Sequence, residues 1–217
     1  MVNKMTKLIL VRHGESIANH NHYFAGQTDV DLYDTGFGQA NCTAKFVADN
    51  YKIDKIYSSD LLRAFNTAKP LGELLSLPIE TNVNLREIFA GDWEAKDFDY
   101  LQNNYKAEYE TWMNDIGAAV CPNGESVEAL KERVVPYFQK LANENEGKTL
   151  AIATHATVIR SFMTYIKYGS IENMKAVPWV TNASVTEVEY ENGKFSLGKV
   201  SEDKHLGEIK THFPSNV

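Results

Sequence analysis

Two short runs made entirely of apolar residues, LILV at 8–11 and LAIA at 150–153, most strongly constrain the fold of this chain. Strands covered on both faces have this pattern, and such strands are typical of parallel sheets. A weaker run, IY at 56–57, indicates a third strand. We therefore predict an α/β fold with a mostly parallel central sheet.

Helical patterns separate these strands. They cover about 36–50, 60–76, 97–115, 125–145 and 156–168. The pattern over 125–145 is the clearest, because apolar residues from Val127 to Leu141 recur every three or four positions. Pro136 lies inside it and predicts a kink or break, since proline removes a helical hydrogen bond. Helices on both faces of the sheet predict a three-layer sandwich.

The C-terminal part has strand patterns of another kind. Residues 183–190 alternate between apolar and polar, and Asn192-Gly193 predicts a hairpin turn into a last strand. We expect an antiparallel edge to close the sheet. The polar tail after residue 200 is expected to be poorly fixed.

Length and charge bound the function. A chain of 217 residues fits a single domain over 1–217. Its net charge of −7 argues against non-specific binding to nucleic acid or to an anionic membrane. Cys42 and Cys121 match no disulfide or zinc pattern, and no segment resembles a signal peptide or membrane span. We expect a cytoplasmic protein.

Reactive side chains follow three of the predicted strands. Arg12, His13 and Gly14 come after LILV, Arg63 lies in the helix after IYSS, and His155 comes after LAIAT. Ligands of open α/β sheets bind beyond the carboxyl ends of the strands. The arginines suit a phosphate, because a guanidinium bonds two phosphoryl oxygens at once and stays charged. Gly14 is expected to let the backbone approach the ligand.

Seven motifs extend this pattern over residues 7–200. They are RHGES, AGQTDVDL, SSDLLRAFNTA, LREIFAGDWE, PNGESVEALKERVVPYF, THATVIR and NASVTEVEY. In type and order they resemble the histidine phosphatase superfamily, branch 1, which includes cofactor-dependent phosphoglycerate mutases and fructose-2,6-bisphosphatases. The resemblance implies a phosphoglycerate mutase-like fold with a substrate-capping insertion around 96–124.

The resemblance also implies a role for each catalytic residue. His13 is the nucleophile, Glu87 the proton donor, and Arg12, Arg63 and His155 form the phosphate pocket. Further substrate contacts are expected from Asn19, Gly26, Gln27 and the backbone of Ala156.

The chemistry requires these parts. A nucleophilic His13 must be neutral, which the neighbouring cations favour, and its phosphohistidine divides the transfer into two easier steps. A leaving alcohol needs an acid, and Glu87 is our choice, with Glu15 as the rival. Arg86 would oppose a raised pKa of Glu87 if it pointed inward. A backbone carbonyl is the expected partner of the second nitrogen of His13.

The sequence departs from the family pattern at several positions. Ala156 and Thr157 replace two glycines after the second histidine, which makes the pocket wall bulkier. Ala95 replaces a glycine, and Ala25 replaces a polar phosphate contact whose task Gln27 is expected to assume.

We predict a phosphomonoesterase acting on a small phosphorylated metabolite, without metal or organic cofactor. His20 and His22 are interpreted as solvent-facing, because no third ligand accompanies them. A cofactor-dependent phosphoglycerate mutase is the alternative. It needs extra cations, yet all five arginines lie in motifs already assigned, and residues 96–124 hold two lysines against five acids. Aromatic residues in that stretch are expected to be core packing. A second alternative is a non-catalytic module that binds phosphorylated ligands. The substrate and the oligomeric state stay open.

Overall fold

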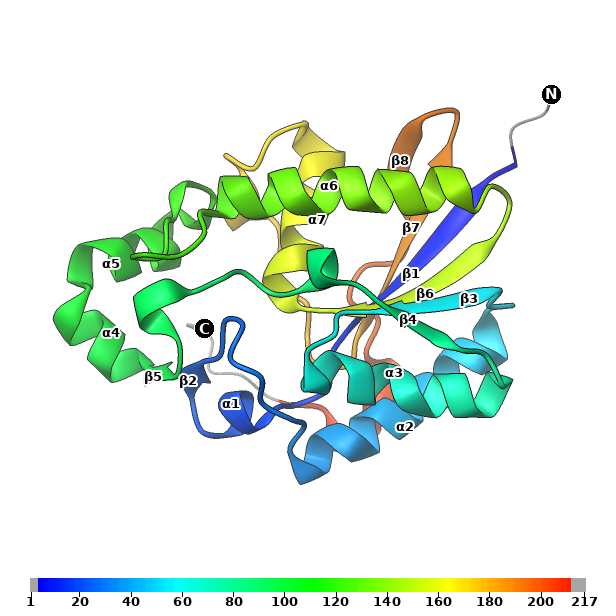
Figure 1. The fold of residues 1–217 in the computed structure, drawn as a ribbon, viewed down its shortest axis with the longest axis horizontal. Helices are drawn as coiled ribbons and strands as arrows, with labels where there is room; N and C mark the ends of the chain where they lie inside the picture. Colours follow the sequence, from blue (N-terminus) through cyan, green and yellow to red (C-terminus); the bar gives the residue numbers. More distant parts are fainter. Residues whose placement is uncertain (1–3, 212–217) are drawn as a thin grey trace.

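A six-stranded sheet forms the centre of the protein (Figure 1). The computed structural model describes residues 4–211. The strand order is β4-β3-β6-β1-β7-β8, and β4, β3, β6 and β1 are parallel. The strands are β1 (Thr6–Arg12), β3 (Lys55–Ser58), β4 (Ile79–Thr81), β6 (Thr149–Thr154), β7 (Val185–Glu191) and β8 (Lys194–Leu197). The short edge strand β4 has no apolar run, so it was not predicted from the sequence.

Helices cover both faces of the sheet, as predicted (Figure 1). Alternate residues of β1 point to opposite faces. Leu8 and Leu10 belong to the core beneath α6 (Val127–Glu144) and α7 (Ala156–Tyr168). Ile9 and Val11 belong to the core beneath α2 (Asp34–Asn50) and α3 (Leu62–Leu75). The predicted three-layer α/β sandwich is therefore confirmed.

Helix α6 is continuous across Pro136, so the expected break is absent (Figure 1). Proline frees only the carbonyl four residues earlier, here that of Glu132. Both Pro136 and Glu132 are exposed, so water can satisfy the freed carbonyl.

The predicted helix over 97–115 is divided into α4 (Phe98–Asn104) and α5 (Lys106–Asn114). Tyr105 between them has φ −132° and ψ 43°, outside the helical region. A 3₁₀ turn, η3 (Ile116–Ala118), follows. Strand β5 (Lys96–Asp97) pairs with β2 (Tyr23–Phe24), which joins this insertion to the loop after α1 (Ile17–His20). The insertion forms one end of the molecule (Figure 1).

The C-terminal hairpin agrees with the prediction, but the tail does not. Strand β7 pairs antiparallel with both β1 and β8, and Asn192 and Gly193 in the turn both have positive φ. Residues 201–211 pack on the domain: η5 (Lys204–Ile209) buries Leu206. Nε2 of Gln39 donates to the carbonyl of Ile209 and to Oγ1 of Thr211, both at 2.8 Å. The expectation of a poorly fixed tail is therefore wrong for residues 201–211, and its part over 212–217 lies outside the described residues.

None of the helices within residues 4–211 has the length and apolar character that a membrane crossing requires.

Candidate active site

The carboxyl ends of β1 and β6 open into a cavity of about 540 Å³. The two strands are in register, with Arg12 opposite Thr154, so His13 and His155 follow at the same level. Seven of the predicted site residues line the cavity, namely Arg12, His13, Asn19, Gly26, Arg63, Glu87 and Ala156. His155 lies behind His13, fully buried, with the ring centroids 5.2 Å apart. Gln27 does not line the cavity, and its Nε2 donates to the carbonyl of Glu87.

The ring of His13 is held in one orientation. Its Nδ1 lies 2.7 Å from the carbonyl oxygen of Gly14, which can only accept, so Nδ1 carries the proton. Nε2 then has a free lone pair. Burial, followed by the positive charges of Arg63 and Arg12, lowers the pKa of His13 well below its ordinary value. The imidazole is therefore neutral and able to act as a nucleophile at neutral pH.

Two buried guanidinium groups flank His13. Arg12 donates from Nη1 to the carbonyl of Val180 at 2.7 Å. Arg63, only 1 % exposed, donates to the carbonyls of Thr28 at 3.0 Å and Gly26 at 2.7 Å. Burial lowers the pKa of Arg12 to about 10, so it remains charged at neutral pH. These fixed cations can hold a phosphate.

The N-terminus of α7 adds further donors. His155 occupies the N-cap position, and Ala156, the first residue of the helix, lines the cavity. Amide groups in a first helical turn lack helical acceptors and favour anions. Both ring nitrogens of His155 are buried without a hydrogen-bond partner among residues 4–211.

Glu87 brings a carboxyl group to the same cavity. It accepts hydrogen bonds from the backbone N–H of Ile88 at 2.8 Å and of Thr157 at 3.2 Å. Burial raises its pKa, against the opposing effect of these N–H groups and of Arg63. Arg86 does not point inward, because it forms an ion pair with Asp60. A carboxyl group with a raised pKa can act as a general acid.

The rival acid, Glu15, does not line the cavity. Its carboxylate lies 3.8 Å from Nδ1 of His20, whose exposed ring stacks on Tyr33. His22 is also exposed. Across residues 4–211, no three His, Cys, Asp or Glu side chains are grouped as a metal site would require.

Comparison with known proteins agrees with this geometry. The family model of the histidine phosphatase superfamily (branch 1) matches residues 8–203. The chain belongs to this superfamily. It is 27% identical to phosphoserine phosphatase 1 of Hydrogenobacter thermophilus over 206 residues, which cover 94% of this chain and 96% of that protein. It is 29% identical over 202 residues to the uncharacterized phosphatase PhoE of Bacillus subtilis, covering 93% of this chain and 97% of that one. Among solved structures, Bacillus stearothermophilus YhfR superposes with a TM-score of 0.88 at 27% identity, covering 93% of this chain and 99% of that one.

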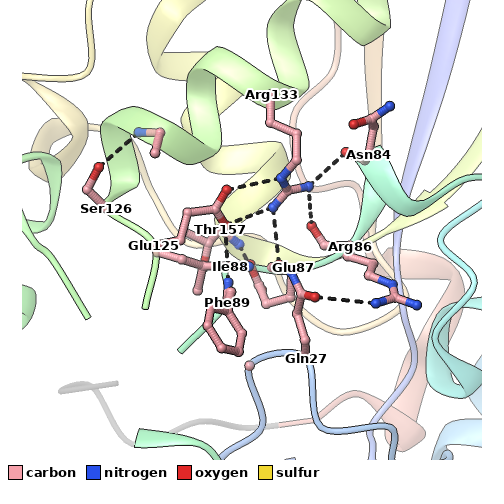
Figure 2. A network of polar contacts seen from close by, with 12 residues as sticks. Gln27, Asn84, Arg86, Glu87, Ile88, Phe89, Glu125, Ser126, Arg133 and Thr157 are labelled. Carbon is pink, nitrogen blue, oxygen red and sulfur yellow. Dashed lines mark hydrogen bonds and ion pairs between the residues drawn. The ribbon is translucent and has the colours of Figure 1, made fainter. Parts of the chain in front are cut away.

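In this histidine phosphatase, an ion pair holds the loop that carries Glu87 (Figure 2). Arg133 on α6 bonds both oxygens of the Glu125 carboxylate, at 3.0 and 2.9 Å. The same guanidinium donates to the carbonyls of Asn84 at 2.9 Å, Arg86 at 3.0 Å and Glu87 at 3.3 Å. The Glu125 carboxylate also accepts from the N–H of Phe89 at 3.1 Å. The pair therefore binds the backbone on both sides of the acid.

We predict that Arg133→Met destabilises the protein by about 2–4 kcal/mol, because a largely buried carboxylate and three carbonyls lose their donor. A misplaced Glu87 should also lower kcat about tenfold or more. Urea unfolding and phosphate release measure the two effects. Lys140→Met is the control, since it removes an exposed ion pair with Glu144 from the same helix and should cost less than about 0.5 kcal/mol. Unchanged stability of Arg133→Met would contradict this role.

The buried histidines predict a loss of stability at acid pH. His155 resembles His13, since burial, followed by the charge of Arg63, lowers its pKa well below the ordinary value. Below about pH 6.5 the unfolded chain therefore binds protons that the folded protein does not. As the pH is lowered below this value, the free energy of unfolding should fall by up to about 1.4 kcal/mol per pH unit for each histidine.

Urea unfolding at pH 7.5, 6.5 and 5.5 measures this slope. His13→Asn and His155→Asn should each show a shallower slope than the wild type. Glu87, with its raised pKa, contributes a slope of opposite sign in all three proteins. Equal slopes in all three would contradict the prediction.

Three supporting residues were not found from the sequence. Nδ2 of Asn182 donates to the carbonyls of His13 at 3.0 Å and Gly14 at 3.2 Å, and to Oδ1 of Asn19 at 3.1 Å. Glu94 accepts from the N–H of Gln27 at 2.7 Å and from the hydroxyl of Thr28. The hydroxyl of Thr67 accepts from the N–H of Gly14 at 3.0 Å. All three lie inside motifs noted in the sequence, but spacing alone indicated no partner for them.

Glycine is required at position 14 for a reason other than the expected approach to a ligand. A Cβ at this position would lie 2.6 Å from the carbonyl oxygen of Gly36. Gly14 does not line the cavity. The glycine therefore permits close approach to the backbone of Gly36, not to a ligand.

The insertion supplies an aromatic wall to the cavity. Phe98, Tyr109 and Trp112 line it, together with Met113 and Ile116. These aromatic residues also pack against the core, so the expectation of core packing was incomplete. Thr157 and Ala156 complete the wall on the side of α7.

Proposed function

We propose that this protein is a phosphomonoesterase whose catalytic cycle passes through a phosphohistidine at Nε2 of His13. The observation that carries the proposal is the neutral His13, fixed through Nδ1, in one cavity with Arg12, Arg63 and Glu87. The related proteins named as phosphatases support it.

In the first step, the phosphate of the substrate binds to Arg12, Arg63 and the N–H of Ala156, with Asn19 as a further contact. The lone pair of Nε2 attacks phosphorus in line, and the bond from phosphorus to the ester oxygen breaks. Glu87 donates its proton to that oxygen, so that an alcohol leaves. The fixed cations stabilise the charge that develops on the transferred phosphoryl group.

In the second step, the Glu87 carboxylate removes a proton from water as the water oxygen attacks phosphorus. The bond from Nε2 to phosphorus breaks, and the electron pair returns to His13. Inorganic phosphate leaves, and Glu87 is protonated again. The same carboxyl group therefore acts as acid and then as base.

We infer a small phosphorylated metabolite as the substrate, because the cavity is about 540 Å³ and partly covered by residues of the insertion. We propose that residues 96–124 cap the substrate within a single catalytic domain over 1–217. One relative is named a phosphoserine phosphatase, and phosphoserine is small enough for a cavity of this volume. The free thiols of Cys42 and Cys121 are compatible with a reducing compartment, and we propose the cytoplasm.

A cofactor-dependent phosphoglycerate mutase is the second candidate, because it would use the same phosphohistidine. A 2,3-bisphosphoglycerate-dependent phosphoglycerate mutase of Staphylococcus saprophyticus is 28% identical over 201 residues. The insertion gives this candidate no support, because neither of its lysines, Lys96 or Lys106, lines the cavity.

Phosphate release from a panel of phosphomonoesters tests the proposal. The panel includes 3-phosphoglycerate with and without 2,3-bisphosphoglycerate. Release of phosphate by the wild type and not by His13→Ala supports the phosphomonoesterase. Conversion of 3-phosphoglycerate to its 2-isomer faster than phosphate release would favour the mutase. Tight binding of these esters with no chemistry would favour a binding module.

A further inference from the structure

A second cationic group lies in the same cavity, away from the phosphate site. Arg160 on α7 lines the cavity and is 6 % exposed. Its Nε donates to the carbonyl of Val177 at 2.7 Å, and its guanidinium stacks on the ring of Trp179 at 4.6 Å. These contacts fix the plane of the guanidinium.

The charge of Arg160 has no counterion within residues 4–211. Its Nη1 and Nη2 make no hydrogen bond there, and no carboxylate forms an ion pair with it. Burial alone lowers its pKa to about 10. By contrast, Arg86 pairs with Asp60 and Arg133 pairs with Glu125. A largely buried cation without a counterion is costly, and an anion bound in the cavity would offset this cost.

Lys175 adds a second positive charge at this place. It lies on the 3₁₀ turn η4 (Met174–Ala176), two residues before Val177, and it lines the cavity. It is exposed and has no ion pair with any described residue. Lys210 also lines the cavity, but its charge is paired with Asp203 at 2.7 Å.

On the backbone of α7, the residues that mark the two cationic places are about one helical turn apart. Arg160 follows Ala156 by four residues on α7, which is about 6 Å along a helix. The segment 177–180 supplies acceptors to both arginines. The carbonyl of Val177 accepts from Arg160, and the carbonyl of Val180 accepts from Arg12. A small ligand can therefore reach both places at once.

We propose that Arg160, assisted by Lys175, binds a carboxylate of the substrate while the phosphate of the same molecule lies at His13. The two unbonded nitrogens of a planar guanidinium match the two oxygens of a carboxylate. This inference rests on the proposed function and deepens it: the preferred substrate is a small phosphomonoester that carries a carboxylate.

The sequence alone does not reveal this site, because extra cations are expected in the insertion and Arg160 lies in the THATVIR motif. Helix α7 and the segment 174–180 bring Arg160 and Lys175 to the cavity from outside the insertion.

The test compares 3-phosphoglycerate with glycerol 3-phosphate, which has a hydroxymethyl group in place of the carboxylate. The wild type should prefer 3-phosphoglycerate in kcat/KM by about ten- to a hundredfold, the value of a charged hydrogen bond. Arg160→Met should reduce the ratio of the two kcat/KM values at least tenfold. The exposed change Lys175→Met, which does not disturb the core, should reduce it less. Lys167→Met is the control, because Lys167 is an exposed lysine of α7 outside the cavity, and the ratio should not change.

A wild type that does not prefer the carboxylate ester would overturn the inference. A ratio that is unchanged in both Arg160→Met and Lys175→Met would also overturn it, because a merely structural role lowers both rates alike. Hydrolysis of p-nitrophenyl phosphate by the wild type separates this result from failure of the proposed function. If neither that ester nor any other is hydrolysed, the proposed function is wrong and the carboxylate site is wrong with it.

Discussion

Phosphate release by His13→Ala should be at least about 10⁴-fold slower than release by the wild type, because the variant has no nucleophile and the remaining pocket only binds the substrate. Nε2 of His13 is the uncharged nitrogen that the bond from Nδ1 to Gly14 leaves free. His155 does not replace it, because its ring is fully buried behind His13 and does not line the cavity.

The measurement is kcat with p-nitrophenyl phosphate, together with thermal unfolding to show that the variant is folded. His20→Ala is the matched control, since His20 is an exposed histidine seven positions further along the chain. It should keep kcat within about twofold, as is usual for surface changes. A His13→Ala protein that retains a tenth of the wild-type rate would refute the assignment of the nucleophile.

Glu87→Gln should lower kcat by about 10²- to 10⁴-fold for esters of alkyl alcohols, the usual contribution of a general acid. An alkoxide is a poor leaving group, whereas p-nitrophenolate leaves without a proton. The loss in kcat/KM, which reports only the transfer to His13, should therefore be much smaller with p-nitrophenyl phosphate. Its kcat still falls, because Glu87 is also the base that activates water. The raised pKa of Glu87 adds a second expectation. With alkyl esters, the wild-type rate should fall at high pH as Glu87 loses its proton, and Glu87→Gln should not show this fall.

Glu15→Gln is the control for this prediction, because Glu15 adjoins the catalytic residues in sequence but lies outside the cavity. Its effect on alkyl esters should be small. A larger loss in Glu15→Gln than in Glu87→Gln would reverse the assignment of the acid.

Much of the fold could be predicted from the sequence, because its strongest signals come from burial. LILV and LAIA lie at the centre of the sheet, and β1 buries Leu8, Ile9 and Leu10 completely. What could not be predicted depends on tertiary contacts. Three features show no pattern in the local sequence. They are the division of the helix at Tyr105, the pairing of β2 with β5 and the packing of the tail around Leu206.

The site residues likewise include some that the sequence predicted and others that depend on tertiary contacts. His13, Arg12 and His155 were predicted from their places after strands, which the topology brings together. Gln27 was expected at the phosphate but contacts the carbonyl of Glu87 instead. The partners of Asn182 lie 163 to 169 positions away, so no spacing rule reveals them. Arg160 showed its importance only through the absence of a counterion within the described part of the chain.

The most direct test of the central claim is to trap the phosphoryl group on the enzyme. A substrate labelled with ³²P is mixed with the wild type and quenched in alkali within the first turnover, and the labelled peptide is sequenced. We predict about one labelled phosphohistidine per chain at most, located at His13 and lost at the rate of phosphate release. His13→Ala should take up no label. Phosphate release without labelled protein, or label on another residue, would contradict the account.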